Sequence, residues 1–80
     1  MIRFEYSADE NLLYVALGEG PAAETLEVEE SVYVDLDADG RPIGIEFLNA
    51  DDFLPFLLRR GGQLTLPERV DDRAFLAVVP

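Results

Sequence analysis

The sequence predicts an α+β fold: an antiparallel β-meander of four or five strands forming a single layer of sheet, with one short helix packed on a face. Three observations predict it. Several short stretches alternate apolar and polar side chains with period 2, as strands with one buried face do. An Asp-Gly pair, which favours tight hairpin turns, separates two of these stretches. One segment, residues 49–62, follows helical spacing.

The chain length indicates a single domain, residues 1–80. A chain of this size buries only about 60% of the surface that it exposes when unfolded, so its stability is marginal. A partner or a second copy of the chain would therefore add useful stability.

Two strands joined by a short turn are expected at the N-terminal end. Residues 2–6 (IRFEY) alternate apolar and charged side chains, and residues 12–17 (LLYVAL) are apolar, with the polar turn SADEN between them. Residues 18–24 contain two glycines and a proline, which predicts a loop. Residues 26–36 again alternate, either as one long strand or as two strands with a bend near Glu30.

The stretch DLDADGRPIGIE, residues 35–46, fits both a calcium-binding loop and a β-hairpin. With Asp39-Gly40 at the centre of a turn, every facing pair is apolar on both sides. The expected pairs are Leu36 with Ile43, Val34 with Ile45, and Val32 with Phe47. A slip of one residue would turn one strand to its other face, so the register favours the hairpin.

The calcium interpretation lacks the two helices that flank such a loop. The residues before Asp35 alternate with period 2, and Pro55 interrupts the position of the second helix, where an interior proline costs about 3 kcal/mol. Pro42 also removes a backbone N–H within the loop. We therefore predict no metal site and a hairpin whose acidic side chains face solvent.

The predicted helix lies within residues 49–62, with Asp51 as its N-cap and Pro55 in its first turn, where no N–H is needed. Its apolar stripe consists of Phe53, Leu54, Phe56, Leu57 and Leu58. Its C-terminal end carries two arginines and two glycines, Arg59, Arg60, Gly61 and Gly62, which suit the helix dipole and a stop.

The remaining expectations concern the core and the tail. The aromatic residues predicted to be buried are Phe4, Tyr14, Phe47, Phe53 and Phe56. The stretch AFLAVV, residues 74–79, is predicted to be a last strand, whose pairing the sequence leaves open.

The net charge of −11 is concentrated in the first two thirds of the chain. Residues 1–52 carry fourteen acids against two arginines, and residues 53–80 carry three acids against four arginines. So negative a surface repels nucleic acid and anionic lipid and favours a basic protein as partner. No apolar run approaches the roughly 20 residues that span a membrane and the N-terminus lacks a signal-peptide layout, so a cytoplasmic location is expected.

The chain contains no His, Cys or Lys, the residues that most often act as bases, nucleophiles or Schiff-base formers near neutral pH. We therefore expect no enzymatic activity, no catalytic residue and no cofactor. The mixed acidic and aromatic side chains on the outer face of the predicted hairpin are the candidates for contact with a partner. These are Tyr33, Asp35, Asp37 and Glu46.

The residues YSADENLLYVAL and VYVDLDADGRPIGIEFLNA resemble the bacterial domain of unknown function 2283, over about residues 4–50. The positions that carry the resemblance are Tyr6, Leu13, Tyr14, Leu17, Asp35, Asp37, Gly40, Gly44, Ile45 and Glu46. The resemblance implies an antiparallel sheet followed by a helix in a small bacterial protein. It brings no established activity and suggests an antitoxin-like role as a hypothesis.

Two classes of function follow. The first is a non-enzymatic, acidic interaction module that binds a basic partner, such as a basic nuclease in the antitoxin-like case. The second is a carboxylate-based ligand binder, with calcium as its extreme form. A structural domain that self-associates as a homodimer is a further alternative.

Overall fold

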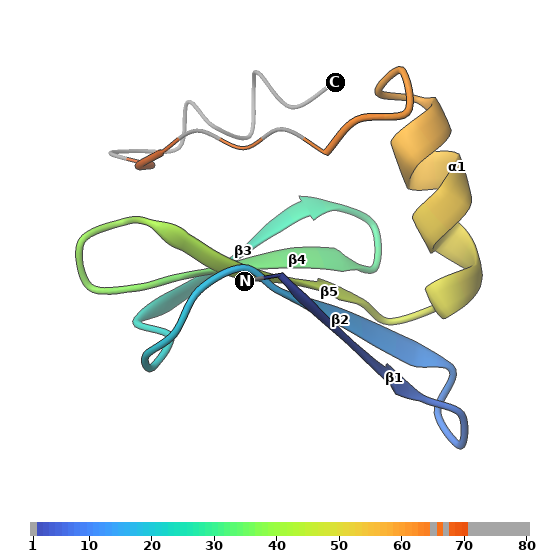
Figure 1. The fold of residues 1–80 in the computed structure, drawn as a ribbon, viewed down its shortest axis with the longest axis horizontal. Helices are drawn as coiled ribbons and strands as arrows, with labels where there is room; N and C mark the ends of the chain where they lie inside the picture. Colours follow the sequence, from blue (N-terminus) through green and yellow to red (C-terminus); the bar gives the residue numbers. More distant parts are fainter. Residues whose placement is uncertain (1, 65, 67, 71–80) are drawn as a thin grey trace.

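The computed structural model describes residues 2–64, 66 and 68–70 (Figure 1). Within this part of the chain, five antiparallel strands form one sheet and a short helix follows them, so the predicted α+β class is confirmed. The elements are β1 (Arg3–Ser7), β2 (Leu12–Ala16), β3 (Glu24–Glu29), β4 (Val32–Leu36), β5 (Pro42–Phe47), the 3-10 helix η1 (Ala50–Asp52) and α1 (Phe53–Leu58). The strand predicted over residues 74–79 lies outside the described residues.

The strand order is β1-β2-β5-β4-β3. The predicted hairpin of β1 and β2 is confirmed, and β3, β4 and β5 form a second antiparallel unit. The order departs from that of a simple meander at one connection, because the loop after β2 leads to the far edge and β5 then pairs with β2. This arrangement puts the facing, fully buried pair Val15 and Ile45 at the centre of the sheet, where strands on both sides shield it.

The alternating stretch from Leu26 onward forms two strands, not one. A tight turn at Glu30 and Ser31 separates β3 from β4, and Ser31 has a positive φ of 66°. A β-bulge lies between Glu27 and Glu29, so that Glu29 faces Val32. The extra residue changes the face on which the end of β3 presents its side chains.

The β4–β5 hairpin is confirmed, with Val32 facing Phe47 and Val34 facing Ile45 as predicted. The third predicted pair is wrong, because Leu36 faces Pro42 and the register shifts by one residue after Asp35.

The shape of the turn explains this shift. The Gly40 N–H donates to the Asp37 carbonyl at 3.0 Å, and Gly40 has a φ of +82°. This is a three-residue loop that ends on a left-handed glycine, and not a two-residue turn centred on Asp39-Gly40. The additional loop residue is compensated by the bulge in β5, beside Ile43.

The helical segment begins earlier than predicted. The side chain of Asn49, not that of Asp51, caps η1 by accepting a hydrogen bond from the Asp51 N–H at 3.0 Å. Pro55 lies in the first turn of α1 as expected. Beyond the helix, Gly61 and Gly62 have φ values of +71° and +80°, which end it as predicted.

The core lies between the sheet and α1. Phe47 is 0% exposed and meets the rings of Phe53 and Phe56 edge-on, at centroid distances of 5.3 and 5.1 Å. The other buried members of the cluster are Leu13, Val15, Leu26, Val32, Val34, Leu36 and Ile45.

Part of the predicted apolar stripe is exposed. Leu54 and Leu58 point away from the sheet, and Phe4, predicted to be buried, is 59% exposed. Phe4 lies on β1, the edge strand, where the ring of Phe53 approaches it edge-on at a centroid distance of 6.0 Å.

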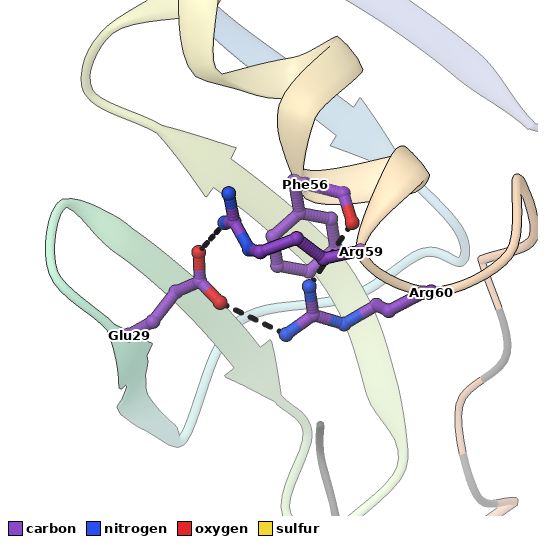
Figure 2. A network of polar contacts seen from close by, with 4 residues as sticks. All are labelled: Glu29, Phe56, Arg59 and Arg60. Carbon is purple, nitrogen blue, oxygen red and sulfur yellow. Dashed lines mark hydrogen bonds and ion pairs between the residues drawn. The ribbon is translucent and has the colours of Figure 1, made fainter.

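An ion-pair cluster fastens α1 to β3 (Figure 2). The Glu29 carboxylate accepts hydrogen bonds from Arg59 and from Arg60, the latter at 2.9 Å. The Arg60 guanidinium also stacks on the ring of Phe56, 3.7 Å from its centroid, and donates to the Phe56 carbonyl. The bulge in β3 makes this contact possible because it turns Glu29 toward the helix.

The sheet therefore has two different faces. In Figure 1, α1 and the described residues that follow it lie on one side of the sheet, which is the core face. No described element covers the opposite side. Within the described part of the chain, no helix is both long and apolar enough to cross a membrane.

Candidate functional site

The uncovered side of the sheet, here called the open face, includes four of the ten residues that carry the resemblance described above: Tyr14, Asp35, Gly44 and Glu46. Side chains alternate between faces along a strand, so the strand pairing identifies those that share it. They are Arg3, Glu5, Ser7, Leu12, Tyr14, Ala16, Thr25, Glu27, Tyr33, Asp35, Gly44 and Glu46.

Five of these residues form a straight row across all five strands, here called the acidic-aromatic row. Each is the direct cross-strand partner of the next, in the order Glu5, Tyr14, Glu46, Tyr33, Glu27. Facing side chains lie about 5 Å apart, so each tyrosine is flanked by two carboxylates. With strands about 4.8 Å apart, the row is roughly 19 Å long.

The next row of facing residues on the open face contains Thr25, Asp35 and Gly44, and hydrogen bonds join it to Tyr14. The Tyr14 hydroxyl donates to Asp35 Oδ2 at 3.0 Å, and the Thr25 hydroxyl donates to Asp35 Oδ1 at 2.6 Å. Tyr14 extends from β2 to β4 and so passes over β5 at Gly44. A Cβ at Gly44 would lie 1.7 Å from the Tyr14 hydroxyl oxygen, so only glycine leaves room for the ring.

This environment raises the pKa of Tyr14 from its ordinary value of 10.0 to about 12. Burial is the largest cause, followed by the hydrogen bond to Asp35 and by the negative charges of Asp35, Glu46 and Glu5. Tyr14 is therefore neutral near pH 7 and acts as a hydrogen-bond donor, not as a base.

The structure brings together three of the four predicted contact residues. Tyr33 and Glu46 face each other in the acidic-aromatic row, and Asp35 lies beside them. Asp37 is instead part of the β4–β5 turn, where its Oδ1 accepts from the N–H groups of Asp39 and Arg41 at 2.8 and 2.9 Å. These hydrogen bonds lower the pKa of Asp37, and the one from the Arg41 N–H contributes most. Asp37 is therefore a residue that stabilises the turn.

The sequence pattern missed two residues of this site. Tyr14 was predicted to be buried, which is wrong, because it lies half-buried on the open face. Thr25 carried no signal in the sequence. The one available clue was Gly44, whose place within an apolar strand indicates a close approach by another group.

The residues that match the calcium-loop pattern do not converge. Asp35 accepts hydrogen bonds on both oxygens, Asp37 is engaged in the turn, and Glu46 belongs to the row of the open face. Over residues 2–64, 66 and 68–70, no three His, Cys, Asp or Glu side chains gather closely enough to hold a metal ion.

The stability of the wild type is expected to fall as the pH rises from 10 to about 12. The folded protein raises the pKa of Tyr14, so it favours the protonated hydroxyl. The resulting stabilisation is complete below pH 10 and is lost as Tyr14 ionises in the folded state. Urea midpoints measured across this range should converge on those of Tyr14→Phe, which has no ionisable group there. Parallel curves for the two proteins would contradict the assignment.

Gly44→Ala should displace the Tyr14 ring into solvent and break its hydrogen bond to Asp35. The added methyl group overlaps the end of a flexible side chain, so the sheet can persist while the ring moves. Ultraviolet titration should then show the pKa of Tyr14 falling from about 12 toward 10. Gly18→Ala, whose added methyl would make only ordinary contact with Ile43 at 3.5 Å, tests whether any glycine substitution has this effect. An unchanged Tyr14 titration in Gly44→Ala would show that the Tyr14 ring does not pass over β5 at Gly44.

Among the comparisons with known proteins, a family model gives a match. The family model described as "Protein of unknown function (DUF2283)" matches residues 3–50, which is 48 of the 80 residues and includes all five strands. No curated protein and no solved structure shows significant similarity to the chain.

Proposed function

Because the chain belongs to the DUF2283 family, whose function is unknown, we propose a function from its own surface: it is a non-enzymatic module whose open face binds a basic segment of another protein. The observation that supports this proposal is the acidic-aromatic row. It presents three carboxylates and two tyrosine rings on a side of the sheet that no described element covers.

Among the described residues, basic side chains neutralise this row only at its β1 end, where Arg3 pairs with Glu5 at 2.6 Å. Among the described residues of the open face, Arg3 is the single basic residue, and it lies at one corner of the sheet. Arg59 and Arg60 bind Glu29 on the core side. The row therefore keeps a negative potential that attracts a cationic partner and speeds its association.

The tyrosines give the row a preference for arginine. Tyr33 lies between Glu46 and Glu27, so a guanidinium bound between these two glutamates would approach its ring. Cation–π contacts of this kind contribute about 0.5–1 kcal/mol each at exposed sites. The raised pKa of Tyr14 keeps that ring neutral, and its hydroxyl is already engaged by Asp35.

The spacing of the row indicates the spacing of the partner's charges. Glu5, Glu46 and Glu27 lie on every second strand, so successive carboxylates are separated by roughly 9.6 Å. Three residues of a polyproline II segment rise about 9.3 Å and return the side chain to the same side of the segment. A polyproline II segment with arginine at every third position would therefore match the spacing of all three glutamates.

The chemistry of the chain supports binding over catalysis. It has no His, Cys or Lys, and the one strongly shifted group of the open face, Tyr14, is shifted toward its neutral form. An antitoxin-like protein that covers a basic nuclease would be one form of this function.

The test is a titration with a seven-residue peptide that carries arginine at positions 1, 4 and 7 and glycine elsewhere. We expect saturable backbone NMR shifts centred on the five residues of the row. Affinity should decrease as salt rises, because exposed charge pairs are screened. A peptide of the same composition with three consecutive arginines is the matched ligand control and should bind more weakly.

The protein controls distinguish the row from general charge attraction. Glu46→Gln removes the central carboxylate and should weaken binding several-fold, whereas Glu30→Gln, in the β3–β4 turn, removes the same charge outside the row and should not. Equal effects of the two variants, or shifts spread over all acidic residues, would refute a specific site on the open face.

A further inference from the structure

The β1 edge exposes apolar side chains that a folded monomer would be expected to cover. Within the described part of the chain, β1 pairs with β2 alone and forms one edge of the sheet. Ile2, Phe4 and Tyr6 project from it toward the core face and are each 59% exposed. An edge that combines free backbone hydrogen-bonding groups with an apolar face is a template for another strand.

The opposite edge does not share this property. Strand β3 carries three glutamates, at positions 24, 27 and 29, and its central apolar residue, Leu26, is 2% exposed. Negative charge along an edge repels a second copy of the same edge. Any extension of the sheet by a second copy is therefore favoured at β1.

We propose that β1 pairs antiparallel with β1 of a second copy, so that the sheets of the two chains become continuous and Phe4 faces Phe4 of the partner subunit. A two-fold axis perpendicular to the sheet relates the two copies, which keeps both core faces on the same side. This inference concerns a different surface from the one that binds the basic segment.

The charges of β1 select the register. Within one copy, Arg3 pairs with Glu5 at 2.6 Å. With Phe4 on the two-fold axis, Arg3 also faces Glu5 of the partner subunit, and the same pair forms again on the other side of the axis, so the four charges alternate in sign. On the core face, Ile2 then faces Tyr6 of the partner subunit. Opposite charges and apolar side chains are thus matched at every position, and such cross-strand pairs are stabilising.

The alternative registers bring unfavourable pairs together. Centring the axis on Glu5 sets two glutamates against each other, and centring it on Arg3 sets two arginines against each other. A slip of one residue turns one chain over and places its polar face beside the apolar face of the other. Arg3, the single basic residue among those described on the open face, thus lies where one acidic copy meets another.

A groove beside the proposed β1–β1 interface adds to the apolar surface that the pairing of the two copies would cover. A cavity of about 530 Å³ lies on the core face, and the residues that line it include Ile2, Phe4, Val15 and Phe53. Two of these residues, Ile2 and Phe4, also belong to the exposed edge. The partner's β1 would close the groove on its open side.

Disulfide trapping tests the register, because the chain contains no cysteine. In Phe4→Cys the two thiols would face each other across strands whose Cα atoms are about 4.5–5.5 Å apart, a separation that suits a disulfide. Mild oxidation should therefore give a covalent dimer. In Ser7→Cys the thiols would be offset by six residues, roughly 20 Å, and the protein should remain monomeric. Equal cross-linking of the two variants, or none in Phe4→Cys, would overturn the register.

Sedimentation equilibrium tests the association itself. The wild type should form a dimer, and Arg3→Glu should weaken it tenfold or more, because both cross-strand pairs become repulsive. The double variant Arg3→Glu/Glu5→Arg restores opposite charges and should recover the dimer. Circular dichroism checks that each variant is folded. A wild type that stays monomeric at millimolar concentration, or an Arg3→Glu protein that dimerises normally, would refute the proposal.

Discussion

Phe47→Ala is expected to destabilise the protein by about 3–5 kcal/mol and to leave much of the chain unfolded at 25 °C. Phe47 is 0% exposed and joins the sheet to α1 through edge-on contacts with Phe53 and Phe56. Its removal takes apolar surface from the core and leaves a cavity that the strands on either side of β5 prevent from collapsing.

The small size of the protein makes this loss decisive. At about 0.05–0.15 kcal/mol per residue, a chain of 80 residues has a total stability of only roughly 4–12 kcal/mol. Urea unfolding followed by circular dichroism measures the change. Leu54→Ala is the matched control, because Leu54 is 65% exposed and its truncation should cost no more than about 0.5 kcal/mol. A Phe47→Ala protein as stable as Leu54→Ala would show that this aromatic cluster does not hold the helix to the sheet.

The difference in burial between Phe47 and Phe4 shows why the core could be predicted from the sequence only in part. Alternation identifies which side chains of a strand share a face, and it correctly paired Val32 with Phe47 and Val34 with Ile45. It contains no information on which strand lies at an edge. Phe4 was therefore predicted to be buried although β1 has a single neighbour and leaves the ring exposed.

The candidate site was predictable to a similar extent. Tyr33, Asp35 and Glu46 alternate with core residues of the hairpin, so their common face could be inferred from the sequence. Tyr14 lies in the run LLYVAL, which is apolar on both faces, so nothing in that run distinguishes the inner side chains from the outer ones. Its role depends on β5 pairing with β2, a contact between strands distant in sequence.

Two local irregularities of the sheet, a turn and a bulge, could not be predicted from the apolar pattern, although they determine which residues face each other. The three-residue turn after Asp37 shifts one facing pair, and the bulge in β3 turns Glu29 to the core side. Neither changes the apolar periodicity from which strands are predicted. Both are determined by local hydrogen bonds and by contacts with α1 that form only in the folded chain.

Glu29→Ala is expected to cost about 2–3 kcal/mol, because it removes the acid that binds both arginines at the end of α1 (Figure 2). The Arg60 side chain is only 8% exposed and is held over Phe56 by stacking and by its hydrogen bond to the Phe56 carbonyl. Without Glu29 its charge would stay largely buried with no opposite charge nearby, which is more costly than losing an exposed ion pair.

Three further variants separate this effect from a general change in charge. Glu30→Ala removes the same charge from the adjacent, exposed turn and should change the urea midpoint little. Glu29→Gln keeps a hydrogen-bond acceptor without the charge and should fall between the two. Arg60→Met in the Glu29→Ala background replaces the unpaired cation with an apolar side chain and should recover part of the loss. If Glu29→Ala were no less stable than Glu30→Ala, the bulge in β3 would have no role in fastening the helix, and α1 would depend on its aromatic contacts alone.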